Sequence, residues 1–172
     1  MISGIVVDAC VMQRFIAGLI SSTTNDETKL VDCIRAGKGF AVDEEQKILT
    51  QWRETCGHLV MEDWIAQGVQ SGTIRAVGNR TDQRHKKALT LKEGFPYSDR
   101  HEGTYVEVAA AASPHLLVTV DIDFWEPTAK GRTSVQKQKI IDSGRGGVRR
   151  YLKRKMGVTV LTPGAALVEL EC

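Results

Sequence analysis

The sequence predicts an α/β protein, built as a three-layer α/β/α sandwich around a central, mostly parallel sheet of four to five strands. Short, almost wholly apolar runs at 5–7 and 116–120 are typical of strands that are buried on both faces. Segments with helical spacing of apolar residues separate these runs. Strands that alternate with helices favour a parallel sheet covered by helices, and 172 residues suit a single domain.

The first half of the chain alternates strand and helix patterns. We expect a strand at 5–7, helices at 11–21 and 28–36, a strand at 40–42, a helix from 43 that reaches His58, and a helix at 61–70. The third of these helices opens with Asp43 followed three residues later by Gln46, which is a capping-box pattern. Gly37 and Gly39 end the helix before it.

The second half begins with a polar stretch, 71–100, that we interpret as mostly loop with a short helix near 85–91. We expect a helix of small residues at 103–112, the strand at 116–120, and a last strand at 158–161 that ends before Pro163.

Positive charge is concentrated in one segment. Residues 127–157 hold ten Lys and Arg against one acid, Asp142, whereas the rest of the chain holds 13 basic and 20 acidic residues. Such a segment is typical of a surface that contacts the phosphates of nucleic acid without reading sequence, although a solvated helix face has the same composition. The candidate phosphate contacts are Arg145, Arg149, Arg150, Lys153 and Arg154.

The four cysteines, at 10, 33, 56 and 172, lie far apart and lack the C-x-x-C spacing of zinc sites. We therefore expect free thiols and a reducing compartment. There is no basic flank before an apolar run at the N-terminus, and no window approaches the roughly 20 apolar residues that span a bilayer. These features predict a cytoplasmic protein without a membrane partner.

Both strong strands end on an acid, Asp8 and Asp121. In a parallel sheet the carboxyl ends of the strands lie at one edge, so the two carboxylates should meet there. Carboxylates that approach each other repel unless a proton or a cation lies between them. Mg²⁺ or Mn²⁺ is the natural cation for oxygen ligands. The alternative is that each Asp caps the following helix.

At this point the sequence resembles the PIN-domain nucleases. The start of that family resembles the run Ile5-Val6-Val7-Asp8 with the amphipathic helix after it. The segment 117–124 is similar to the family's T-x-D strand end, and the segment 157–163 is similar to its closing strand. The resemblance implies one PIN-like domain over 1–172, with 127–157 as a basic insertion. It also implies an Mg²⁺- or Mn²⁺-dependent endoribonuclease, which in many small bacterial members is a toxin neutralised by an antitoxin.

Carried over to this sequence, the resemblance implies that Asp8, Glu102 and Asp121 are catalytic, with Asp99 as the alternative to Glu102. These three acids, together with Asp123 and Glu44, are the expected metal ligands. Asp43 and Glu45 are alternatives to Glu44, and all three could instead serve as helix-cap charges. Thr119 is expected to orient Asp121.

Two positions depart from the family pattern. Gln51 stands where many members have Glu, and Cys10 stands where a small hydroxyl or amide residue often follows the first Asp. The alternative function is therefore a catalytically weakened PIN-like module that binds RNA or a protein. A phosphate-transfer protein ranks third, because the chain lacks an obvious late strand-end Lys. The expected partners are RNA, an antitoxin or other protein, and a second copy of the chain.

Overall fold

A computed structural model describes residues 3–57, 59–99 and 101–172. It confirms the α/β class. Three short strands, β1 (Val6–Val7), β4 (Leu116–Val118) and β5 (Thr159–Leu161), form a parallel sheet in the order β1-β4-β5. Leu117 lies opposite both Val6 and Val160.

A second parallel sheet pairs β2 (Phe40–Asp43) with β3 (Ile74–Val77). One isolated bridge, Ile5 with Phe40, lies between the two sheets, and the Ile5 amide donates to Gly39 O over 2.9 Å. The single central sheet of four to five strands is therefore not confirmed. The strands are split into sheets of three and two.

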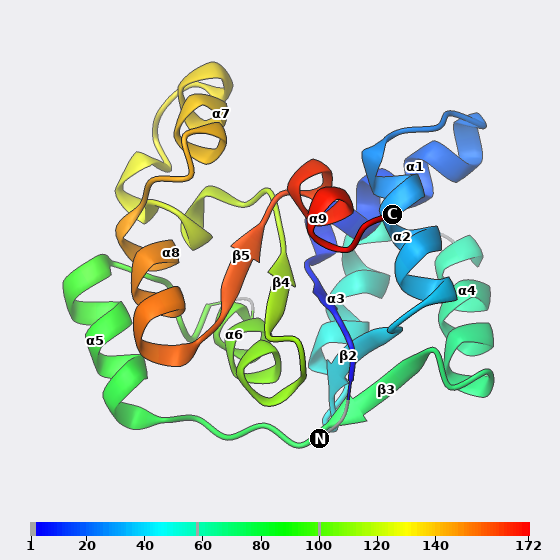
Figure 1. Ribbon diagram of the computed structural model, residues 1–172, viewed down its shortest axis with the longest axis horizontal. Helices are drawn as coiled ribbons and strands as arrows, with labels where there is room; N and C mark the ends of the chain where they lie inside the picture. The colour runs from blue at the N-terminus through cyan, green and yellow to red at the C-terminus, as the bar shows by residue number, and fades with distance from the viewer. Residues whose placement is uncertain (1–2, 58, 100) are drawn as a thin grey trace.

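Helices surround the strands (Figure 1). They are α1 (Ala9–Ser21), α2 (Asp26–Ala36), α3 (Lys47–Cys56), α4 (Leu59–Gln70), α5 (Gln83–Glu93), α6 (Glu102–Ala111), α7 (Ser134–Asp142), α8 (Gly147–Tyr151) and α9 (Pro163–Glu169). Short 3-10 turns follow β4 at η1 (Ile122–Phe124) and η2 (Pro127–Ala129), and a π-helical turn, η3 (Leu152–Met156), continues α8. In Figure 1, α7 stands away from the body of the molecule.

In the stretch 71–100, the short helix expected near 85–91 is present as α5, which is longer than expected. The interpretation of the remainder as loop is wrong at β3, a strand that was not expected. In β3 the outer residues Ile74 and Val77 are buried and the two between them are exposed. That pattern is neither the continuous apolar run nor the alternation by which a strand is detected. The helix expected to reach His58 ends at Cys56 with Gly57 in the left-handed region, and His58 lies outside the described residues.

The prediction of four free thiols is wrong for two of them, because Cys33 and Cys172 form a disulfide. The partners are 139 residues apart in sequence and meet where α2 packs against α9. Sequence spacing carries no sign of this contact. Cys10 and Cys56 remain free. The disulfide removes the basis on which a reducing compartment was expected.

The core behind the candidate site is aromatic. Trp52 of α3 is fully buried, contacts Phe40 and Trp64 edge to face, and donates from Nε1 to Val7 O over 3.0 Å. This bond fixes α3 against the last residue of β1, immediately before Asp8. Within the described part of the chain, no helix has both the length and the apolar character needed to cross a bilayer.

Candidate metal centre

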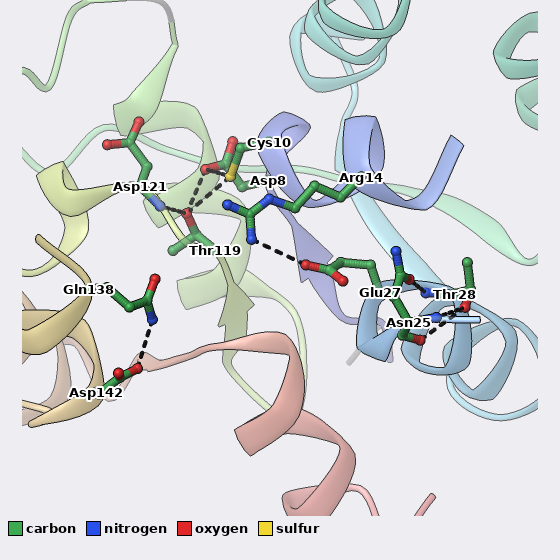
Figure 2. Close-up of polar contacts among 10 residues, drawn as sticks. All are labelled: Asp8, Cys10, Arg14, Asn25, Glu27, Thr28, Thr119, Asp121, Gln138 and Asp142. Atoms are coloured by element: carbon green, nitrogen blue, oxygen red, sulfur yellow. Dashed lines mark hydrogen bonds and ion pairs between the residues drawn. The ribbon is translucent and has the colours of Figure 1, made fainter. Parts of the chain in front are cut away.

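Two parallel strands bring Asp8 and Asp121 to the same edge of the sheet. The Asp8 amide donates to Val118 O over 2.9 Å, which continues the pairing of β1 with β4. Asp8 therefore lies beside the end of β4, and Asp121 follows that strand after two further residues. Figure 2 shows the Asp8 carboxylate beside the Thr119 hydroxyl, and the Asp121 carboxylate pointing away from it.

Thr119 connects these two acids. Its Oγ1 donates to Asp8 Oδ2 over 2.6 Å and accepts from the Asp121 amide over 2.9 Å. Cys10 Sγ donates to the same Asp8 oxygen over 3.1 Å. From the sequence we expected Thr119 to orient Asp121 alone. In the structure, its hydroxyl contacts the Asp8 side chain as well as the Asp121 backbone.

Three acids form the centre of the site. One carboxylate oxygen from each of Glu102, Asp121 and Asp123 lies within 4.8 Å of the other two. Glu102 is the first residue of α6, and Asp121 caps η1 by accepting from the Asp123 amide over 3.0 Å. The start of α6 and the segment of η1 with its N-cap, which are far apart in the sequence, thus bring three carboxylates together.

Two oxygens of this group are buried without a partner. Glu102 Oε2 and Asp123 Oδ1 have no hydrogen-bond partner among the described residues, although these side chains are only 8% and 2% exposed. A buried carboxylate oxygen without a partner costs free energy. A divalent cation that takes oxygen ligands would remove this cost, so the residues present fit Mg²⁺ or Mn²⁺.

The pKa values of the acids are raised chiefly by burial. Burial, together with the nearby charges of Asp121, Asp8 and Asp123, raises the pKa of Glu102 to about 7. Burial also raises the pKa of Asp8, against the hydrogen bonds from Thr119 and Cys10 that lower it. Each added proton or cation therefore stabilises the cluster.

A residue that sequence reasoning missed lies against the cluster. Lys130 Nζ is 2.8 Å from Asp123 Oδ2. Lys130 follows η2, and it belongs to the basic segment that was expected to contact nucleic acid. Within that segment nothing in the sequence distinguishes it from its nine basic neighbours, so its contact with an acid could not be predicted.

The structure does not bring Glu44 into this group of acids. Glu44 is exposed and lines a surface hollow with Gly78 and Glu107, while Asp43 caps α3 by accepting from the amides of Lys47 and Ile48. Asp43 therefore has the helix-capping role that we considered as the alternative to metal binding. The capping box with Gln46 is not formed, since the helix begins at Lys47.

Asp99, the alternative to Glu102, and Gln51, which stands in place of a Glu, are the two remaining positions to place. Asp99 is exposed and accepts from the Glu102 amide through its backbone oxygen, so Glu102 is the acid whose side chain joins the group. Gln51, on α3, has a buried Oε1 with no hydrogen-bond partner in the described part of the chain.

All five candidate phosphate contacts line one hollow of about 370 Å³. Two of them are held by the protein itself. Arg149 donates to Gly144 O over 2.7 Å and to Val160 O over 3.1 Å, and Lys153 donates to Thr159 Oγ1 over 2.6 Å. The remaining three, Arg145, Arg150 and Arg154, have no side-chain hydrogen bond or ion pair among the described residues.

The hollow is attached to the acid cluster through η1. Val148 donates from its amide to Trp125 O over 3.3 Å, and Gly146 lies against the same oxygen. A Cβ at Gly146 would be 2.2 Å from Trp125 O, so only glycine allows this approach. Trp125 is two residues beyond Asp123, which links the position of the hollow to that of the acids.

Comparisons with family models, with curated proteins and with solved structures give no match to this chain.

Proposed function

We propose that this chain is a PIN-like nuclease that uses Mg²⁺ or Mn²⁺ to hydrolyse phosphodiester bonds, with RNA as its substrate. The observation that carries the proposal is the meeting of Glu102, Asp121 and Asp123, two of which each have a buried oxygen without a partner among the described residues. An acid group that served only as helix caps would have its oxygens satisfied by backbone amides.

Glu102, Asp121 and Asp123 would hold the ion, and Asp8 would support it from the neighbouring strand end. A divalent ion supplies charge stabilisation for a phosphate and makes nearby water more acidic. The protein's own contribution is to keep the carboxylates in place before the ion binds. Thr119 does so by bonding Asp8 and the Asp121 backbone together.

We infer that β3-β2-β1-β4-β5 act as one parallel sheet, in which the Ile5–Phe40 bridge joins the two parts. The Ala41 amide also donates to Ile5 O over 3.0 Å, so the junction has ladder-like hydrogen bonds on both sides of Ile5. A continuous sheet would agree with the α/β/α sandwich that the resemblance implies.

The basic hollow supports RNA as the substrate. Arg145, Arg150 and Arg154 offer guanidinium groups that can form paired hydrogen bonds with phosphate oxygens. Such contacts hold a strand without selecting its sequence. The toxin-like role, the antitoxin or other protein partner, the homodimer and the cytoplasmic location stay predictions that follow from the resemblance and the sequence.

Gln51 favours a second candidate function, the catalytically weakened module that binds RNA or a protein. An amide in place of a carboxylate binds a divalent ion less strongly.

One assay distinguishes the two functions. The purified protein is mixed with labelled single-stranded RNA and Mn²⁺, with and without chelator, beside Asp121→Asn and the exposed control Asp99→Asn. The nuclease predicts chelator-sensitive cleavage that is lost in Asp121→Asn and kept in Asp99→Asn. RNA binding without cleavage in all three proteins supports the weakened module, and cleavage that survives in Asp121→Asn refutes the proposed site.

A further inference from the structure

A lysine occupies part of the acid cluster. Lys130 caps η2, whose last residue, Ala129, is fully buried, so the backbone of this segment is anchored in the protein. The Lys130 side chain is 69% exposed, yet its Nζ lies 2.8 Å from Oδ2 of Asp123, whose own side chain is 2% exposed. An ammonium at the surface thus contacts a carboxylate that is buried.

The contact satisfies the cluster only in part. Asp123 Oδ1 and Glu102 Oε2 keep no hydrogen-bond partner among the described residues. One ammonium group therefore faces three carboxylates that lie within 4.8 Å of one another. A second cation is still attracted to the site, and any ligand set that includes both oxygens of Asp123 requires Lys130 to move.

We propose that Lys130 is a tethered cation that shares this site with the divalent ion. It neutralises Asp123 in the metal-free protein, and it releases Asp123 Oδ2 when the ion binds. This inference rests on the proposed function. It adds that the ammonium group of Lys130 competes with the divalent ion for Asp123. The exposed stem of the side chain leaves Lys130 free to leave Asp123 without a change in the buried part of η2.

The chain offers a control that separates contact from charge. Lys137, on α7, also lowers the pKa of Asp121 by its charge, but it forms no hydrogen bond or ion pair with the acids among the described residues. A general loss of positive charge near the cluster would raise the affinity in both variants, whereas Lys130→Arg keeps the charge as well as a group able to contact Asp123. Competition for Asp123 Oδ2 would act for Lys130 alone.

The test is calorimetric titration of the metal-free protein with MnCl₂, for the wild type, Lys130→Met, Lys130→Arg and Lys137→Met. Competition predicts that Lys130→Met binds Mn²⁺ about tenfold more tightly, since a charge-assisted hydrogen bond no longer opposes the ion. Lys137→Met should change the affinity less than about threefold, because its charge acts through solvent and salt. Lys130→Arg should stay near the wild type.

Two results would overturn the inference while the proposed function stands. One is an unchanged or weaker affinity in Lys130→Met, and the other is an equal increase in Lys130→Met and Lys137→Met. If Lys130→Met does not fold, Lys130→Arg and Lys137→Met are compared instead. Equal Mn²⁺ affinities in these two variants, both well above that of the wild type, would also overturn the inference. Mn²⁺ binding by none of the proteins would instead overturn the metal site itself, and this inference with it.

Discussion

The hydroxyl of Thr119 joins Asp8 to Asp121, since Oγ1 donates to Asp8 Oδ2 over 2.6 Å and accepts from the Asp121 amide over 2.9 Å. Thr119 itself is fully buried. Two acids that are 113 positions apart are therefore positioned by one side chain, so the geometry of the cluster depends on a residue that would not itself bind an ion.

Thr119→Val tests this link. The substitution keeps the shape of the side chain but leaves Asp8 Oδ2 and the Asp121 amide without their shared partner. We expect a loss of about 1–3 kcal/mol in the free energy of unfolding, measured by urea denaturation, and a clear loss of Mn²⁺-dependent cleavage. Thr119→Ser, which keeps the hydroxyl, should retain most of both. Equal behaviour of the two variants would contradict the role of the hydroxyl.

Glu102 predicts a specific dependence of stability on pH. Its pKa is raised to about 7 in the folded protein from an ordinary value of 4.5. Between these two values the folded state holds a proton that the unfolded state has released, so stability falls as pH rises through this window. Above pH 7 the metal-free protein therefore carries the full cost of the buried charge.

Glu102→Gln should remove this cost. We expect the variant to be more stable than the wild type by about 1–2 kcal/mol at pH 8, and to lose that advantage at pH 4. Urea denaturation of metal-free protein at both values measures the difference. A variant that is less stable than the wild type at pH 8 would show that the Glu102 carboxylate is well compensated in the folded state.

The Cys33–Cys172 disulfide closes a loop of 139 residues. Disulfides that close long loops commonly stabilise by about 2–4 kcal/mol. Cys33→Ser, or treatment with reductant, should therefore lower the melting temperature in calorimetry. Cys56→Ser is the control, because Cys56 is free and its substitution leaves the disulfide intact. Identical melting of oxidised and reduced wild-type protein would argue against the bond.

The basic hollow predicts different effects for its two kinds of arginine. Arg150→Ala should weaken RNA binding at every sequence and reduce the salt dependence of the binding constant by about one unit of slope. Arg149→Ala should mainly reduce stability, because its guanidinium holds Gly144 O and Val160 O. Arg35→Ala, at the exposed end of α2, is the control. Fluorescence anisotropy over a salt series measures the binding.

The sequence was sufficient where local pattern determines structure. Continuous apolar runs located β1 and β4, and the parallel geometry placed Asp8 and Asp121 at one edge of the sheet. Glu102 was found because the family spacing before the small-residue helix is itself local. The strand β3 was missed, since its two central residues are exposed and the run resembles a loop.

The rest of the site depends on contacts that no local pattern records. Lys130 meets Asp123 because η2 packs against η1, and Cys33 meets Cys172 because α9 packs on α2. Glu44 was chosen as a ligand from its place in the sequence, but the first turn after β2 leaves it exposed. The packing of distant elements determines the disulfide, whereas the path of a local turn determines the places of Lys130 and Glu44.

The central claim is that Glu102, Asp121 and Asp123 bind a divalent ion. It is tested most directly by titrating metal-free protein with Mn²⁺ and following the free ion by electron paramagnetic resonance, for the wild type, Glu102→Gln and Asp99→Asn. The account predicts saturable binding by the wild type and Asp99→Asn, with binding at least about tenfold weaker in Glu102→Gln. Equal Mn²⁺ affinity in all three proteins would contradict it.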